Sequence, residues 1–236
     1  MVMKRGIIAV IPARGGSKRL PKKNIIDFFG KPLIAWTIEA ALQSKLFDRI
    51  VVSTDSGEIS DIAQDYGAEV PFLRDSSYDD HSPVSAATVA TLKQAQLTLG
   101  ETYDIVIQLM ANCPLRNSKD IVNAYQNFLS IGSDSQISCF KFGWMNPWWA
   151  VTLDDTKHPL PLFPEKAGKR SQDLPPLYCP TGAIWIAKYA ALMESGTFYT
   201  PGHTFFSMPW QSALDIDDQD DLEMCRAVHA MTENTL

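Results

Sequence analysis

The chain has 236 residues, of which 45% are hydrophobic and 20% charged, a composition typical of a soluble globular protein with one sizeable core. The formal net charge of −6 argues against general nucleic-acid binding, because the basic residues cluster in one loop instead of spreading along a face. No apolar run approaches the roughly 20 residues of a membrane span, and the run near the N-terminus is too short for a signal peptide, so we expect a cytoplasmic protein.

Strand-type and helix-type patterns alternate along the first half of the chain. Short runs rich in Val and Ile predict strands, and apolar residues at helical spacing predict the helices between them. The predicted elements, in chain order, are a strand at 6–12, a helix at 31–45, a strand at 49–54, a helix at 56–66, a short strand at 69–73, a helix at 84–99, a strand at 103–109 and a helix at 118–129 with Ser118 as its N-cap. This alternation predicts an α/β fold whose mostly parallel sheet is covered by helices on both faces.

The stretch 140–178 breaks this alternation. It contains Trp144, Trp148 and Trp149 together with six prolines, has no helical period, and is too long for an ordinary loop. We expect an excursion from the core, such as a hairpin, whose aromatic residues pack on a partner subunit; the alternative is a large loop folded on its own chain. After it, the predicted elements are strands at 182–187 and 204–208 and a helix at 219–231. We therefore assign residues 1–236 to a single domain with 140–178 as an inserted dimerisation segment.

A cationic loop containing two glycines follows the first strand. After Pro12 the chain supplies Gly15 and Gly16, the Ser17 hydroxyl, and five cations within ten residues. Glycines let backbone N–H groups approach phosphate oxygens, and Arg and Lys neutralise the charge of a triphosphate. The loop matches neither the P-loop pattern nor G-x-G-x-x-G. We expect a triphosphate site here; the alternative is a solvated basic turn after an edge strand.

Two aspartates, Asp215 and Asp217, come just before the last predicted helix. Residues two apart in an extended segment face the same side, so both carboxylates can hold one Mg²⁺ (or Mn²⁺), with the triphosphate supplying further oxygens. The alternative is that Asp217 or Asp218 caps the helix. Because ligands of parallel sheets bind at the carboxyl ends of the strands, we expect the basic loop, Asp55 and the loop 114–116 to gather at one edge.

The basic loop carries a specific resemblance. The chain resembles the opening of the acylneuraminate (CMP-sialic acid synthetase-like) cytidylyltransferases in the run Ala13-Arg14-Gly15-Gly16-Ser17-Lys18, followed by Pro21 and Lys23-Asn24, and it matches the family's D-x-D at Asp215-Ile216-Asp217. The resemblance covers nearly the whole chain. It implies a Rossmann-like three-layer α/β/α nucleotidyltransferase fold and a homodimer that pairs through the excursion. It also implies transfer of CMP from CTP to the anomeric hydroxyl of a nonulosonic, sialic-acid-like 3-deoxy-2-ulosonic acid, with release of pyrophosphate.

The resemblance also implies roles for individual residues. Arg14 and Lys23 are expected to stabilise transition-state charge, and Asp215 and Asp217 to hold the metal. The nucleotide site is expected to contain Ala13, Arg14, Gly15, Ser17, Lys18, Lys23, Asn24, Arg74 and Ser85. The sugar site is expected to contain Gln108, Met110, Arg170, Gln172, Tyr178, Phe198 and Tyr199, although Phe198 and Tyr199 would equally suit core packing.

Departures from the family pattern concentrate in the presumed sugar pocket. The family run Q-P-T-S-P-L-R reads Met110-Ala111-Asn112-Cys113-Pro114-Leu115-Arg116 here, and Cys179, Thr181 and Trp185 replace the arginine, asparagine and tyrosine of R-P-N-G-A-I-Y. We infer that the reaction is kept while the sugar differs from N-acetylneuraminate, with legionaminate and pseudaminate as candidates. The alternatives are a 3-deoxy-manno-octulosonate or other sugar nucleotidyltransferase, and a non-catalytic nucleotide-sugar-binding protein.

Overall fold

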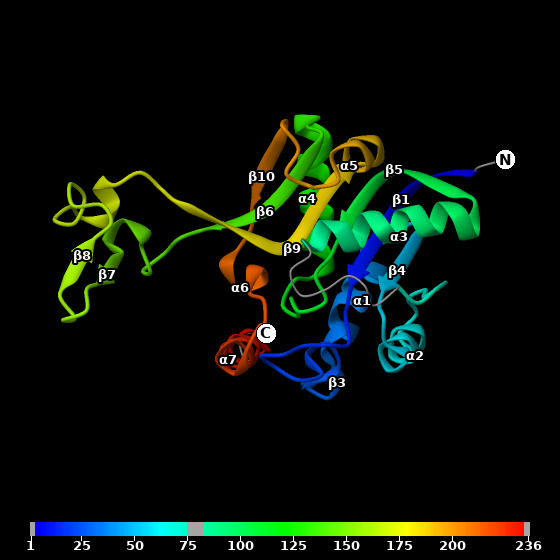
Figure 1. The fold of residues 1–236 in the computed structure, drawn as a ribbon, viewed down its shortest axis with the longest axis horizontal. Helices are drawn as coiled ribbons and strands as arrows, with labels where there is room; N and C mark the ends of the chain where they lie inside the picture. Colours follow the sequence, from blue (N-terminus) through cyan, green and yellow to red (C-terminus); the bar gives the residue numbers. More distant parts are fainter. Residues whose placement is uncertain (1–2, 75–82, 234–236) are drawn as a thin grey trace.

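A six-stranded sheet forms the centre of the fold (Figure 1). The structure, a computed structural model, describes residues 3–74 and 83–233. The strands lie in the order β10-β6-β9-β5-β1-β4, and β9 is antiparallel to both of its neighbours while the other pairs are parallel. The strands of this sheet are β1 (Met3–Pro12), β4 (Arg49–Ser53), β5 (Glu101–Gln108), β6 (Ser135–Lys141), β9 (Tyr178–Lys188) and β10 (His203–Ser207). The predicted α/β fold with a mostly parallel sheet is confirmed.

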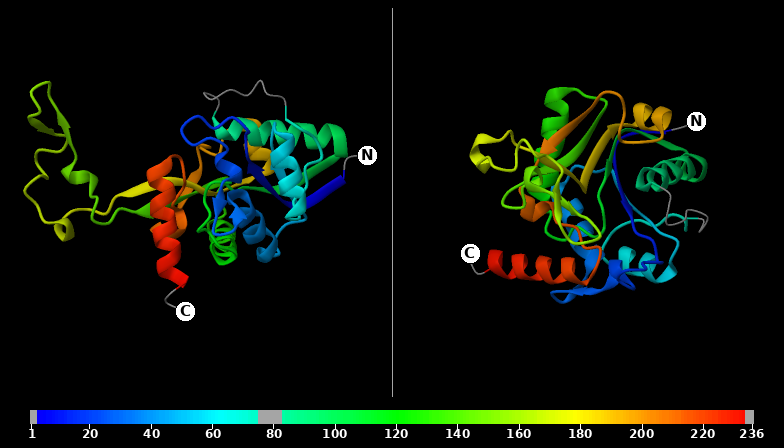
Figure 2. Two further views of the ribbon diagram at one scale, coloured as in Figure 1. Left: turned by 90° about the horizontal axis from the view of Figure 1, so that it is seen from below. Right: turned by 60° about the vertical axis from the view of Figure 1, so that its left-hand side comes forward.

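Helices pack on both faces of this sheet, which makes three layers (Figure 2). Side chains alternate along β1, so Ala9 and Ile11 join one buried cluster and Ile8 and Val10 join the other. Helices α1 (Leu33–Ser44), α2 (Gly57–Asp65) and α4 (Ser118–Ile131) contribute to the first cluster, and α3 (Val84–Leu99) and α5 (Tyr189–Ser195) to the second. The remaining elements are β2 (Asp27–Phe28), β3 (Lys31–Pro32), α6 (Trp210–Ala213), α7 (Gln219–Glu233) and the short 3₁₀ turns Lys23–Ile25, Pro147–Trp149 and Ser171–Asp173.

The strand predicted at 69–73 is wrong. Only Glu69 pairs with the sheet, through a bridge to Val51, with Glu69 N–H donating to Ile50 O at 2.8 Å and Val52 N–H donating to Glu69 O at 2.9 Å. Pro71 has no N–H to donate, so the ladder cannot continue past it.

The N-cap of α4 also differs from the prediction. Asn117, not Ser118, caps the helix: its Oδ1 accepts from Lys119 N–H at 2.8 Å and from Asp120 N–H at 3.1 Å. Asp120 Oδ2 accepts in return from Asn117 N–H at 3.0 Å, which completes a capping box. Asn and Ser are equally good caps, so residue type alone could not choose between adjacent positions.

Replacing the cap tests this assignment. Asn117→Ala is expected to lower the free energy of unfolding by about 1 kcal/mol, because two N–H groups of the first turn of α4 lose their acceptor. Urea unfolding followed by circular dichroism measures the change. Ser118→Ala is the matched control and should change stability by less than about 0.5 kcal/mol. The reverse order of the two effects would contradict the capping box.

A long arm projects from the sheet between β6 and β9 (Figure 1). It carries a small hairpin of β7 (Val151–Leu153) and β8 (Pro159–Pro161), and its base closes where Phe142 N–H donates to Leu177 O at 3.0 Å. Many of its apolar side chains are exposed, among them Trp144 at 83%. The arm therefore extends away from the core of its own chain.

The cysteines and the helices show two further properties of the chain. All four cysteines are free, and Cys113, Cys139 and Cys225 are buried. Burial raises the pKa of Cys113 and of Cys225 to about 12 each. Within residues 3–74 and 83–233, no helix is both long enough and apolar enough to cross a membrane.

Candidate active site

The basic loop begins where β1 ends and is held by two polar side chains. Gly15 N–H donates to Asp55 Oδ1 at 2.8 Å, and Asn24 Nδ2 donates to Arg14 O at 2.9 Å. Gly15 lies so close to the start of α2 that a Cβ atom there would sit 3.1 Å from Ser56 Cβ. The loop therefore has a defined path at both ends, and this position favours glycine because of the close approach.

Asp215 and Asp217 flank a fully buried residue. Ile216 packs in a third apolar cluster with Leu20 of the basic loop and Leu222 of α7. Because alternate residues of an extended segment face opposite sides, burial of Ile216 turns the two carboxylates away from the core. The same cluster holds the basic loop against the segment that carries the aspartates.

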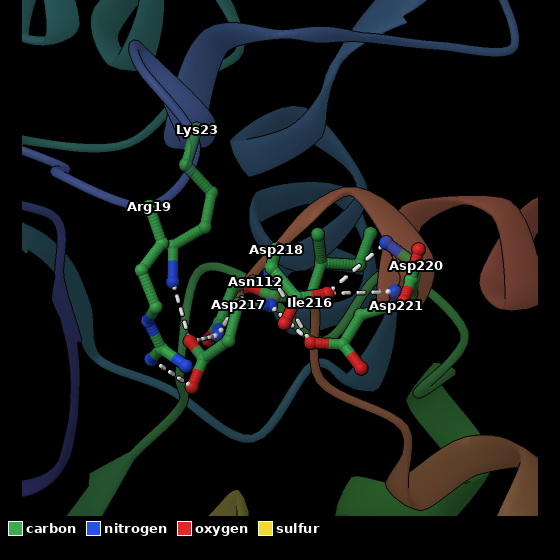
Figure 3. A network of polar contacts seen from close by, with 8 residues as sticks. All are labelled: Arg19, Lys23, Asn112, Ile216, Asp217, Asp218, Asp220 and Asp221. Carbon is green, nitrogen blue, oxygen red and sulfur yellow. Dashed lines mark hydrogen bonds and ion pairs between the residues drawn. The ribbon is translucent and has the colours of Figure 1, made fainter.

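Asp217 is the centre of a polar network (Figure 3). Its Oδ1 accepts from Lys23 Nζ at 2.7 Å and from Asn112 Nδ2 at 3.3 Å, and its Oδ2 accepts from Arg19 Nη2 at 2.7 Å. Burial alone would raise the pKa of Asp217, but the hydrogen bonds and charges of Lys23 and Arg19 outweigh it and lower the pKa. Three segments far apart in sequence therefore meet at one carboxylate.

Aspartates other than Asp217 cap α7, the helix next to this site. Asp218 Oδ1 accepts from Asp220 N–H at 3.0 Å and Asp221 N–H at 3.1 Å, and Asp221 Oδ2 accepts from the N–H groups of Asp217 and Asp218. The alternative that Asp218 caps the last helix is therefore right, and the Asp217 carboxylate is directed to the basic loop instead (Figure 3).

The two aspartates fit a divalent cation that arrives with phosphate oxygens. Burial, followed by the neighbouring charge of Asp217, raises the pKa of Asp215, a repulsion that a bound cation would remove. Among the described residues, no group of three or more His, Cys, Asp or Glu side chains forms a complete protein site. Two carboxylates leave most positions of such a cation open to nucleotide oxygens.

Comparison with known proteins identifies the family. Residues 8–142 match the family described as Cytidylyltransferase. The chain belongs to this family. A pseudaminic acid cytidylyltransferase of Campylobacter jejuni is 37% identical over 229 residues, covering 97% of this chain and 98% of the relative. A CMP-N,N'-diacetyllegionaminic acid synthase of Legionella pneumophila is 34% identical over 237 residues, covering 98% and 99%.

A solved structure shares the fold of this cytidylyltransferase. CMP:2-keto-3-deoxy-manno-octonic acid synthetase in complex with CTP superposes with a TM-score of 0.69 at 20% identity, over 97% of this chain and 100% of the other. At that identity the likeness concerns the fold alone. The expected nucleotidyltransferase fold and the expected membership among cytidylyltransferases of the acylneuraminate and pseudaminic acid type are thus confirmed.

The remaining nucleotide candidates of the cytidylyltransferase lie in the basic loop, next to the end of β4 and at the start of α3. Arg74 Nη1 donates to Ser53 Oγ at 3.2 Å at the end of β4, and Ser85 is buried in the first turn of α3. In the basic loop, Ala13 is buried and continues the β1–β4 pairing by donating to Ser53 O at 2.9 Å. Ser17 is half-buried and Lys18 is exposed.

The candidate residues of the sugar site differ in how deeply they are buried. Gln108 is fully buried, with Oε1 accepting from Thr88 Oγ1 at 2.6 Å. Phe198 is also fully buried in the core, which agrees with the packing alternative, whereas Tyr199 is 46% exposed. The exposed Tyr178 begins β9.

Met110 sits against Gly182 of β9, where a Cβ atom would lie 2.8 Å from Met110 Cγ. Arg170 and Gln172 belong to the arm, which projects away from the sheet (Figure 1). There Arg170 pairs with Asp173 at 2.7 Å. The sugar candidates therefore divide between the end of the sheet and the arm, and the structure does not gather them into one pocket of this chain.

Sequence reasoning gave no role to Arg116, which is 1% exposed. Its Nη1 donates to Ala183 O at 2.7 Å and to Met110 O at 3.3 Å, and its Nη2 donates to Thr37 Oγ1 at 2.7 Å. Burial lowers the pKa of this guanidinium. Arg116 thereby ties the end of β5 to β9 and α1, and it holds the loop that carries Asn112.

Three other site residues had no assigned role in the sequence reasoning, namely Arg19, Asp55 and Asn112. Arg19 counted only as one of the five cations of the basic loop, and Asp55 only as a residue at a strand end. For Asn112 the available signal was its place in the run that ends at Arg116, where the family pattern has threonine.

Proposed function

We propose that this cytidylyltransferase transfers CMP from CTP to the anomeric 2-hydroxyl of a nonulosonic acid and that pseudaminic acid is the preferred sugar. The observation that carries the proposal is the convergence of the basic loop on Asp217, because triphosphate chemistry needs cations and paired carboxylates at one place. The 37% identity with a pseudaminic acid cytidylyltransferase supports the choice of sugar. Met110, in place of the glutamine of the acylneuraminate pattern, agrees with a changed sugar pocket.

The reaction forms one bond and breaks another. The sugar 2-oxygen bonds to the α-phosphorus of CTP, the bond from that phosphorus to the bridging oxygen breaks, pyrophosphate leaves, and the hydroxyl gives up its proton. Arg14, Lys23 and the amides of the basic loop bind the triphosphate and stabilise the charge that develops on it. Asp215 and Asp217 would hold Mg²⁺, which when bound orients phosphate oxygens and stabilises the leaving group.

The proton of the sugar hydroxyl passes to solvent water in this proposal, because both aspartates are assigned to the cation and Asp217 also contacts Lys23 and Arg19.

A substrate panel tests the proposed function. Pyrophosphate release is measured with CTP, ATP, GTP or UTP in combination with pseudaminic, legionaminic, N-acetylneuraminic and 3-deoxy-manno-octulosonic acids, with Mg²⁺ present. We expect release with CTP only, and the highest kcat/KM with pseudaminic acid. A higher kcat/KM with another acid would reassign the sugar, and CTP binding without release for any acid would favour a binding protein.

We also propose that two copies of the chain pair through their arms. Val151 and Leu153 lie two apart on β7 and are 47% and 59% exposed, which is unfavourable for apolar side chains without a covering surface. The arm also carries Arg170 and Gln172, so pairing would offer these residues to a partner's site.

Sedimentation equilibrium tests this pairing. The wild-type chain is expected to be a dimer, and the double variant Val151→Asp with Leu153→Asp is expected to be a monomer, because charges replace the apolar face of β7. Leu97→Asp is the matched control, since Leu97 is 87% exposed on α3 and away from the arm, and it should remain a dimer. A dimer for both variants would place the interface elsewhere.

A further inference from the structure

Two of the five cations of the basic loop are already engaged by one carboxylate in this structure. Arg19 and Lys23 each place a nitrogen 2.7 Å from a different oxygen of Asp217 (Figure 3). Both carboxylate oxygens therefore have a charged donor. The proposed function requires the same carboxylate to face a divalent cation and the same loop to face phosphates.

These two sets of contacts compete. A carboxylate with an Arg and a Lys at contact distance has its charge neutralised and leaves little room for a divalent cation beside it. An Arg or Lys bound to a carboxylate is likewise less able to neutralise phosphate oxygens. A single rearrangement removes this competition. When Arg19 and Lys23 leave Asp217, the two cations become available to the phosphates and the carboxylate becomes available to the divalent cation.

We propose that Asp217 exchanges partners when CTP binds, and that Arg19 is a nucleotide-binding residue released to the triphosphate by this exchange; the inference rests on the proposed function. In the free protein Arg19 and Lys23 neutralise Asp217 and keep the basic loop in place. In the nucleotide complex both cations face phosphate oxygens, and the Asp217 carboxylate becomes available to a divalent cation.

The geometry of the ion pairs permits this exchange. The side chains of Arg19 and Asp217 are 65% and 36% exposed, and an ion pair in contact with solvent contributes little net stability. The Lys23 side chain is 17% exposed, so it would leave Asp217 only for another anionic partner, which a phosphate supplies. Asn112 is 3% exposed and donates both to Ile216 O at 3.0 Å and to Asp217 Oδ1 at 3.3 Å. As a neutral donor it keeps Asp217 oriented after the cations leave.

Calorimetric titration with CTP in EDTA, without sugar, tests the exchange. Removing the charge of Asp217 frees both cations, so Asp217→Asn should bind metal-free CTP about fivefold more tightly than the wild type. Asp218→Asn is the matched control: it removes a neighbouring negative charge that is not part of the Arg19 and Lys23 ion pairs and should change affinity less than twofold. Equal gains for both variants, or no gain for Asp217→Asn, would overturn the exchange.

Arg19→Met separates the role of Arg19 from that of Lys23. In the wild-type background without metal, Arg19 is paired with Asp217, so the substitution should change CTP affinity less than twofold. With Mg²⁺ present, or in the Asp217→Asn background, it should weaken CTP binding about fivefold. A similar loss under all three conditions would mean that Arg19 contacts the nucleotide without any exchange, and no loss under any would remove it from the nucleotide site.

A failure of the exchange can be told apart from a failure of the proposed function. If wild-type protein fails to bind CTP with Mg²⁺ present, the proposed function itself is wrong. If it binds CTP and releases pyrophosphate with a sugar acid, but Asp217→Asn gains nothing in EDTA, only the exchange is wrong.

Discussion

Asp217→Asn is expected to reduce the kcat of CMP transfer about a thousandfold, because the residue that would hold the metal and order the basic loop loses its charge. Asparagine offers one carbonyl oxygen where Asp217 offers two, so at most one of the contacts made by Arg19 and Lys23 would persist, as a hydrogen bond without an ion pair. Pyrophosphate release at saturating CTP and sugar measures the effect. The variant should keep the far-ultraviolet circular dichroism of the wild type, because Asp217 is partly exposed and does not cap α7.

The adjacent aspartate provides the control. Asp218 caps α7, so Asp218→Asn should leave kcat within about tenfold of the wild type and, because asparagine is also a good cap, change stability little. An Asp217→Asn variant that transfers CMP within tenfold of the wild type would remove Asp217 from the catalytic centre.

Arg116→Ala is expected to lower the free energy of unfolding by about 3 kcal/mol. The substitution leaves buried acceptors, the carbonyl oxygens of Met110 and Ala183, without their donor and opens a cavity behind the site. With typical stabilities of about 5–15 kcal/mol, this is a large fraction of the total. The midpoint and slope of urea unfolding measure it.

An exposed arginine serves as the control for this effect. Arg226 Nη2 donates to Asp27 O at 3.0 Å in solvent contact, so Arg226→Ala should change stability by less than about 0.5 kcal/mol. Equal small effects for Arg116→Ala and Arg226→Ala would mean that the buried guanidinium does not hold the two strands together.

Much of the fold was predictable because local patterns and packing agree. The predicted helix 84–99 coincides with α3, since its apolar residues recur at helical spacing and Gly100, at φ 68°, ends it in the left-handed conformation. The strands next to the basic loop are buried on both faces, and their continuous Val and Ile runs are typical of parallel sheets. The expectation of a triphosphate site in the basic loop rests on the same kind of local pattern and stays a prediction.

What escaped prediction depends on contacts between distant segments. Arg19 and Asp217 are 198 positions apart, and no local sequence pattern predicts that they form an ion pair. Arginine is usually exposed, but Arg116 is buried because three acceptors surround its guanidinium: Met110 O just after β5, Ala183 O of β9 and Thr37 Oγ1 of α1. The path of the arm could not be predicted from local patterns either, because its sequence has no hydrophobic periodicity that would indicate a helix or a strand.

The most direct test of the central claim is to identify the product made from CTP and pseudaminic acid in the presence of Mg²⁺. Phosphorus NMR and mass spectrometry of the reaction mixture should show a phosphodiester between CMP and the sugar, and pyrophosphate in equal amount. Formation of free CMP without the sugar linkage, or recovery of intact CTP with every sugar acid of the panel, would contradict the assignment of this cytidylyltransferase to nonulosonic acids.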